Sequence, residues 1–169
     1  SLGYYTVVGY AMQATITFFW VIMHSLIARF TLYRTTRQIA DLTRLVRNLA
    51  LGILAFMALA VAGCLLIGDW LVAALFGPDY HDLGTLLAVA MLAASIQGFE
   101  AMLDALLVAH RRFTQLFALR VLSVVLVAGC AAIGVMAGGL TGVVWGLCAA
   151  FTLHCVALVV TVRPLLRPS

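Results

Sequence analysis

The chain has 169 residues, of which 65% are hydrophobic and only 9% are charged, and its formal net charge is +4. A soluble domain carries about 25% charged residues, so this composition excludes a soluble surface and predicts an integral membrane protein. All ten basic residues are Arg, and they gather in a few short connections. The sequence therefore offers no extended basic surface for a nucleic acid.

Five apolar segments are long enough to cross a bilayer, because a spanning helix needs about 20 mostly apolar residues. They cover residues 4–30, 49–76, 84–109, 113–136 and 140–162. The predicted fold class is therefore all-α integral membrane, a bundle of five transmembrane helices. The chain starts at Ser1 and has no recognisable signal peptide, which we interpret as the sign of a fragment or a trimmed chain.

The arginines predict the topology. Nine of the ten lie at the cytoplasmic ends of the first, third and fifth spans, whereas the connections GPDYHD and MAGG contain none. The positive-inside rule makes the Arg-rich side cytoplasmic. We expect the N-terminus outside, the C-terminus in the cytoplasm, and a multi-pass protein of the inner (plasma) membrane.

The connection RTTRQIADLTRLVRN, residues 34–48, is predicted to form a short amphipathic cytoplasmic helix. At 100° per residue the arginines fall on one arc, and the apolar side chains, such as Leu42 and Val46, fall on the other. We expect this helix to lie on the membrane surface and face anionic headgroups. A specific lipid-phosphate or pyrophosphate site is the alternative. The candidate headgroup contacts are Arg34, Arg37, Arg44 and Arg47.

The third span carries a polar stripe in which Gln97, Glu100 and Asp104 fall within about 60° on a helical wheel. Counting about 1.5 Å per residue from Arg111, Asp104 lies about 10 Å deep and Glu100 about 16 Å deep, near the midplane. A central charge costs about 2.5–3.5 kcal/mol on insertion scales. Each carboxylate must therefore be paired, protonated or hydrated.

Asp104 and Arg120 lie equally far from a turn centred on Arg112, so an antiparallel hairpin places them at the same depth. We predict that they form an intramembrane ion pair. Glu100 has no obvious cation, and Gln97 is its evident hydrogen-bond partner. Two interpretations stay open: a protonated Glu100 that joins helices, or a Glu100 that lines an aqueous cavity with Gln97 and binds a proton or cation coupled to transport.

The remaining patterns indicate packing. Gly138, Gly142, Gly146 and Ala150 recur every four residues and predict close approach of another helix backbone. The four cysteines lie inside apolar spans and are interpreted as small apolar residues. No GxSxG, HExxH or P-loop motif occurs, so we predict no enzyme, no metal site and no cofactor.

Four stretches resemble polysaccharide biosynthesis flippases, within the multidrug/oligosaccharidyl-lipid/polysaccharide exporter superfamily. LFGPDYHDLGTLLAVAML, through Leu75, Phe76, Gly77 and Tyr80, resembles the connection between the ninth and tenth spans of that family. SLGYYTVVGYAM resembles the LG-x-Y start of a C-lobe helix, and GGLTGVVWG resembles the Gly-x-x-Gly opening of the final helix. ALLVAHRR resembles a family motif in which Gly is usual where this chain has His110.

The resemblance covers most of the chain and implies that residues 1–169 are the C-terminal lobe, roughly spans eight to twelve of twelve. Such proteins are not enzymes. They flip polyprenyl-pyrophosphate-linked oligosaccharides to the outer leaflet by alternating access, and cavity cations hold the pyrophosphate. The implied partners are membrane lipids, the lipid-linked glycan and the N-terminal lobe of the same protein. Arg120 is the candidate cavity cation.

Two alternatives stay open. The first is a drug/cation antiporter of the same superfamily, in which Glu100 and Asp104 form the cation site. The second is a small structural membrane subunit.

Overall fold

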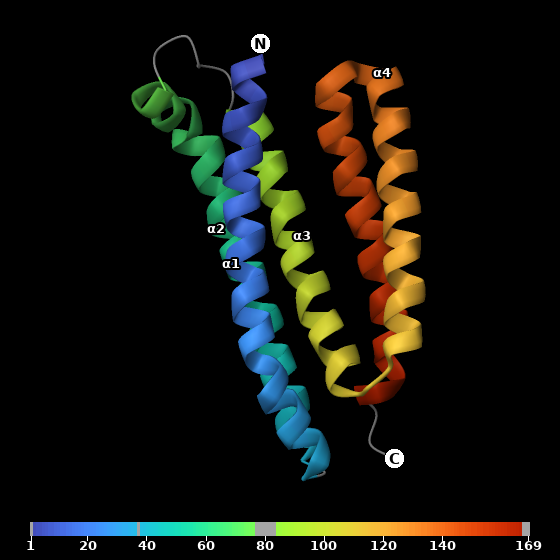
Figure 1. Ribbon diagram of the computed structural model, residues 1–169. Helices are drawn as coiled ribbons and strands as arrows, with labels where there is room; N and C mark the ends of the chain where they lie inside the picture. The colour runs from blue at the N-terminus through green and yellow to red at the C-terminus, as the bar shows by residue number, and fades with distance from the viewer. Residues whose placement is uncertain (1, 37, 77–83, 167–169) are drawn as a thin grey trace.

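The computed structural model describes residues 2–36, 38–76 and 84–166, and these residues form an all-helical bundle (Figure 1). Its elements in chain order are α1 (Leu2–Thr35), α2 (Ile39–Phe76), α3 (Gly84–Ala109), α4 (Phe113–Val162) and the short 3-10 helix η2 (Arg163–Leu166). The described helices contain five stretches long and apolar enough to cross a membrane: Gly9–Thr35, Ile39–Trp70, Gly84–Ala109, Phe113–Gly139 and Thr141–Leu165. The prediction of a multi-pass, all-α membrane protein with five spans is confirmed at this level.

α4 consists of two antiparallel arms, because the chain reverses at Gly138 and Gly139 (Figure 1). We call residues 113–137 the first arm and residues 140–162 the second arm. Gly139 has φ 58° and ψ −131°, a conformation that residues with a Cβ rarely adopt and that glycine adopts readily. The predicted fourth and fifth spans correspond to these arms.

The two arms approach closely at their glycines. A Cβ on Gly142 would collide with the carbonyl of Gly134, and a Cβ on Gly146 would collide with the carbonyl of Cys130. Two glycines of the predicted ladder thus serve close backbone packing, whereas Gly138 lies in the turn with open space around it. Small residues at such a contact let backbones meet where lipid provides no hydrophobic driving force.

We predict that Gly142→Ala destabilises the α4 hairpin by about 1–3 kcal/mol, because the added methyl group meets a backbone carbonyl that no side-chain rotation moves away. The measurement is SDS-induced unfolding in mixed micelles, followed by tryptophan fluorescence. Gly129→Ala is the matched control, since a Cβ at Gly129 has nothing within 4 Å. Equal stability losses for the two variants would contradict the close-approach interpretation.

α3 is the central helix of the bundle. It packs against α1, α2 and α4, and it runs between the α1–α2 pair and the α4 hairpin (Figure 1). In the most apolar stretch of α3 67% of the residues are buried, against 6% in that of α2 and 6% in that of the first arm of α4. The side chains of α3 are therefore the ones that the protein itself surrounds.

α2 fixes the beginning of α3. The Gly84 backbone N–H donates to Asp69 Oδ1 at 2.6 Å, so the carboxylate satisfies one of the amides left open at a helix N-terminus. The two helices can meet there because Gly68 and Gly84 lack side chains: a Cβ on Gly68 would lie 3.0 Å from the Cα of Gly84. Asp69 is thereby assigned a structural role.

The turn between α3 and α4 is a Schellman motif. The Arg112 N–H donates to the Leu107 carbonyl, and the Arg111 N–H donates to the Val108 carbonyl. Arg111 has φ 56°, the left-handed conformation for which glycine is the usual residue. The turn keeps an arginine there at the cost of backbone strain.

We predict that Arg111→Gly stabilises the α3–α4 hairpin by about 1 kcal/mol, because glycine adopts positive φ without the Cβ clash. Arg112→Gly removes the same charge from the same turn, yet Arg112 has φ −90°, so this control gains no such relief. Chemical unfolding of both variants in the same micelles gives the comparison. A stability gain in Arg112→Gly that matched Arg111→Gly would point to charge instead of strain.

The prediction of a separate amphipathic helix at residues 34–48 is wrong. α1 continues to Thr35, and α2 begins at Ile39 and runs without interruption into the second span. Neither Gly nor Pro occurs between Ile39 and Leu51 to end a helix. The apolar face is real, but Leu42 and Val46 pack into the main core of the bundle rather than into a membrane surface.

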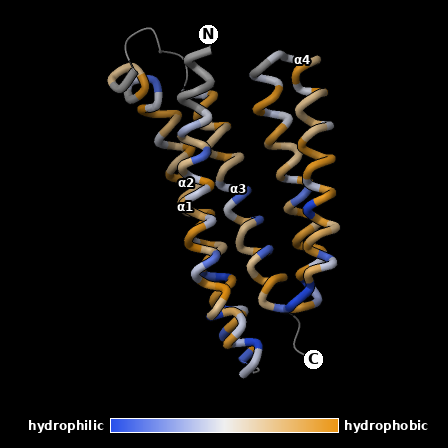
Figure 2. Tube along the Cα trace, in the orientation of Figure 1, coloured by the Kyte–Doolittle hydropathy of each residue, from blue (hydrophilic) through white to orange (hydrophobic). Residues whose placement is uncertain are grey.

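The Arg-bearing connections lie at one end of the molecule. The α1–α2 turn, the α3–α4 turn and η2 all lie at the lower end in Figure 1, and Figure 2 shows hydrophilic residues gathered there. This arrangement is the one that the predicted topology requires, whereas the side of the membrane stays a prediction. The opposite connection, with Gly77 and Tyr80 of the family-like motif, lies outside the described residues.

Candidate functional site

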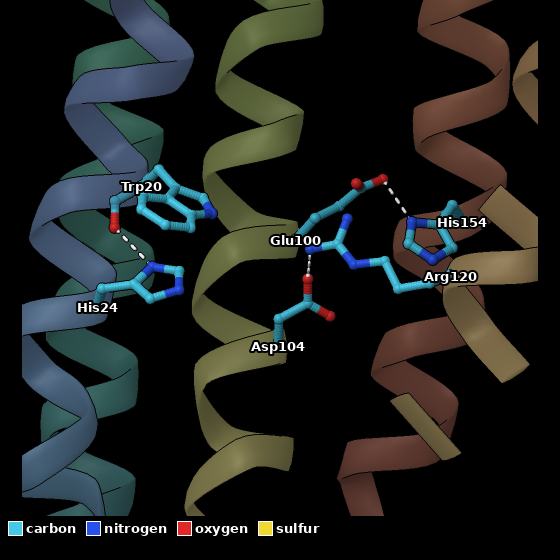
Figure 3. Close-up of polar contacts among 6 residues, drawn as sticks. All are labelled: Trp20, His24, Glu100, Asp104, Arg120 and His154. Carbon is cyan, nitrogen blue, oxygen red and sulfur yellow. Dashed lines mark hydrogen bonds and ion pairs between the residues drawn. The ribbon is translucent and has the colours of Figure 1, made fainter. Parts of the chain in front are cut away.

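Side chains from α1 and from both arms of α4 gather around two buried carboxylates of α3 (Figure 3). Glu100 and Asp104 lie one helical turn apart on α3 and are 5% and 7% exposed. Both extend toward α4 (Figure 3). The two acids of the polar stripe that the sequence predicts on α3 are thus enclosed by the neighbouring helices.

Asp104 contacts Arg120 of the first arm of α4. Arg120 Nη2 donates to Asp104 Oδ2, so the structure brings the predicted pair together. The Asp104 side chain is 10% exposed and that of Arg120 is 53% exposed. The carboxylate is therefore enclosed, while the guanidinium keeps part of its surface open.

Glu100 contacts His154 of the second arm, a partner that the sequence reasoning missed. His154 Nδ1 lies 3.0 Å from Glu100 Oε1, and the two side chains are 1% and 6% exposed. Gln97, the predicted partner, lines a cavity with Glu100, but no hydrogen bond joins the two among the described contacts.

The depth of His154 is set by chain distances from two turns, as the depth of Arg120 is set by its distance from one turn. His154 lies about as far beyond the Gly138–Gly139 turn as Ser123 lies before it. Ser123 in turn lies about as far beyond Arg112 as Ala101 lies before it. Following the chain through both turns therefore places His154 level with Ala101, beside Glu100.

Four buried polar atoms of this cluster have no hydrogen bond of good geometry among the described residues. They are Glu100 Oε1, Asp104 Oδ1 and both ring nitrogens of His154. Such atoms are costly in a low-dielectric interior unless a proton, water or ligand satisfies them. The close Glu100–His154 contact is favourable only when a proton lies between carboxylate and imidazole, because two bare acceptor atoms repel.

Two cavities flank Arg120, one beside each carboxylate. The first has a volume of about 150 Å³ and is lined by Ile16, Trp20, Gln97, Glu100, Ala101, Arg120, Ser123 and Phe151. The second has a volume of about 170 Å³ and is lined by Trp20, His24, Ile27, Ala101, Asp104, Ala105, Val108, Leu116 and Arg120. Each is large enough for several water molecules. The guanidinium thus borders both spaces.

α1 supplies the wall opposite α4. The Trp20 and His24 rings lie 3.7 Å apart at their centroids, and both face the cluster (Figure 3). His24 Nδ1 lies 2.9 Å from the Trp20 carbonyl, so this nitrogen carries the hydrogen and donates. His24 also lines the Asp104 cavity.

The candidate headgroup arginines have different surroundings. Arg34 Nη1 donates to the Ala109 carbonyl at 2.8 Å, which satisfies a C-terminal carbonyl of α3 and joins α1 to it. Arg44 and Arg47 are exposed at the beginning of α2, where they stay candidates for headgroup contact, and Arg37 lies outside the described residues. Arg34 therefore has a structural role that the sequence did not indicate.

Within the described ranges no three His, Cys, Asp or Glu side chains are arranged to hold a metal ion, and the four cysteines are free thiols. No family model, no curated protein and no solved structure matches this chain.

We predict that Arg120→Gln costs about 1–3 kcal/mol of stability, because it leaves the Asp104 carboxylate enclosed without its cation. Asp104→Asn/Arg120→Gln should cost less than Arg120→Gln alone, since two neutral amides can hydrogen-bond each other. A double-mutant cycle of unfolding free energies in mixed micelles measures this coupling. Additive losses would show that the pair contributes nothing to stability.

Proposed function

We propose that the chain is part of a membrane transporter that moves a lipid-linked anion, in the manner of a polysaccharide flippase. The cargo class is a polyprenyl-pyrophosphate-linked oligosaccharide, carried by alternating access with the chain as the C-terminal lobe. The observation that carries the proposal is Arg120, a cation that borders two intramembrane cavities and is 53% exposed at its side chain.

Arg120 has donors to spare. A guanidinium has five N–H donors in a fixed fork that matches phosphate geometry, and Asp104 accepts from Nη2. Arg120 lines both cavities, and Ser123 and Gln97 add polar side chains to the lining of the first one. A phosphate oxygen placed there receives charge-assisted hydrogen bonds at low dielectric.

Cation transport is the second candidate, and a specific observation favours it. Glu100 and Asp104 bring two carboxylates to the cluster, and each keeps one buried oxygen without a well-formed hydrogen bond. An organic cation in the cavity would be attracted by this excess of acid over Arg120, and the Trp20 ring offers it an aromatic surface.

The test is equilibrium binding of radiolabelled farnesyl diphosphate, a short prenyl diphosphate, to the chain in lipid nanodiscs. Arg120→Gln should weaken binding about tenfold or more, which corresponds to the loss of about 1.4 kcal/mol or more of interaction. Arg29→Gln is the matched control, because Arg29 is an exposed arginine outside both cavity linings. It should leave the dissociation constant within about twofold.

Tetraphenylphosphonium in the same assay separates the two candidates. Binding of this cation that strengthens in Arg120→Gln, together with no binding of the diphosphate, would reject the flippase proposal in favour of cation transport. Equal effects of Arg29→Gln and Arg120→Gln on diphosphate binding would show that surface charge alone attracts the ligand.

A further inference from the structure

We propose that Glu100 and His154 form a proton-binding site whose occupancy is thermodynamically linked to anion binding at Arg120. The inference rests on the proposed function, because it takes Arg120 as the anion contact. It adds a second ligand, the proton, and fixes the sign of the coupling: each of the two ligands strengthens the binding of the other.

The charges of the cluster require a proton. Glu100 and Asp104 carry two negative charges when ionised, and Arg120 carries one positive charge. With a neutral His154 the enclosed cluster has one net negative charge, which is expensive away from water. One proton, held by Glu100 or by His154, makes the cluster neutral.

Geometry assigns that proton to the Glu100–His154 pair. Their Oε1 and Nδ1 atoms lie 3.0 Å apart, so one hydrogen joins them even when the imidazole is neutral. The additional proton then occupies the second ring nitrogen, Nε2, which is buried and has no hydrogen-bond partner among the described residues. Asp104 already has Arg120 as its cation. A metal ion fits this position poorly, because no third His, Cys, Asp or Glu ligand joins the pair in the part of the chain that the structure describes.

The other titratable groups near the pair lie on three faces. α1 presents His24 to the Asp104 cavity, α3 presents Asp104 itself, and α4 presents Arg120 together with Cys155, the partly buried neighbour of His154. The membrane-embedded acid of α2, Asp69, is engaged at Gly84. His24 is therefore the other imidazole whose protonation must be separated from that of His154.

The sign of the linkage follows from neutrality. An anion bound to Arg120 adds negative charge within the same enclosed cluster, so the Glu100–His154 pair gains affinity for protons. By reciprocity a protonated pair binds the anion more tightly. A cation ligand would give the opposite sign and release the proton.

The experiment measures farnesyl diphosphate binding to the chain in nanodiscs at pH 6 and pH 8, for wild type, E100Q/H154Q and H24Q. Ionisation of the ligand itself changes the dissociation constant of every variant by the same factor. For each protein we therefore take the dissociation constant at pH 8 divided by that at pH 6, and we divide this ratio by the same ratio measured for E100Q/H154Q. We expect a quotient of about threefold or more for wild type and for H24Q, since one whole proton changes affinity about tenfold per pH unit.

Single variants keep the test decisive if the double variant does not fold. E100Q should bind the diphosphate more tightly than wild type at pH 8 and about equally at pH 6, because glutamine removes the charge that the proton removes. H24Q is the matched control: it leaves both carboxylates, Arg120 and His154 in place and should keep the wild-type pH dependence.

The outcomes separate the two proposals. A wild-type pH dependence that survives unchanged in E100Q, or an affinity that weakens on acidification relative to E100Q/H154Q, overturns the proton site while the anion site stands. Loss of the pH dependence in H24Q but not in the other variants would assign the proton to His24, and it would also overturn the proposed proton site at Glu100 and His154. Absence of diphosphate binding at both pH values rejects the proposed function, and the linkage with it.

Discussion

The two carboxylates of α3 impose the constraint on which the rest of the structure depends. Neither Glu100 nor Asp104 can face lipid at an acceptable cost, so α3 must be surrounded by protein. α1 and α2 cover one side, and the α4 hairpin covers the other. Because lipid tails are as apolar as the helices, hydrophobicity does not favour this association. Polar contacts and close backbone packing must hold the helices together, and Arg120, His154 and the glycines of α4 supply both.

Turn geometry sets the chemistry of the cluster. The α3–α4 turn fixes the depth of Arg120 relative to Asp104, and the Gly138–Gly139 turn fixes the depth of His154 relative to Glu100. One inserted residue in either arm would move the side chains beyond it by about 1.5 Å along the helix and about 100° around it. The left-handed conformations at Arg111 and Gly139 are therefore part of what positions the site, although neither residue touches it.

The sequence predicts those features that depend on local composition or on chain distance alone. The ends of α3 match the predicted span, because Ala109 precedes a polar turn and Gly84 follows a Pro-containing connection. The Asp104–Arg120 contact follows from equal distances to one turn. The continuity of α2 was missed because amphipathicity does not tell whether Leu42 and Val46 meet lipid or protein. His154 was missed because its position depends on two turns, and because an isolated histidine in an apolar span has no local signature.

The cluster pairs two acids with one fixed and one titratable base. A helix joint is best served by fixed, fully satisfied charges, since every unsatisfied buried atom weakens it. Here Asp104 has a permanent cation in Arg120, whereas Glu100 has an imidazole whose charge depends on one proton. A buried cluster that changes its net charge without changing its fold can favour a charged ligand in one state and disfavour it in the other. Alternation between two such states is the energetic requirement that any coupled transporter must meet.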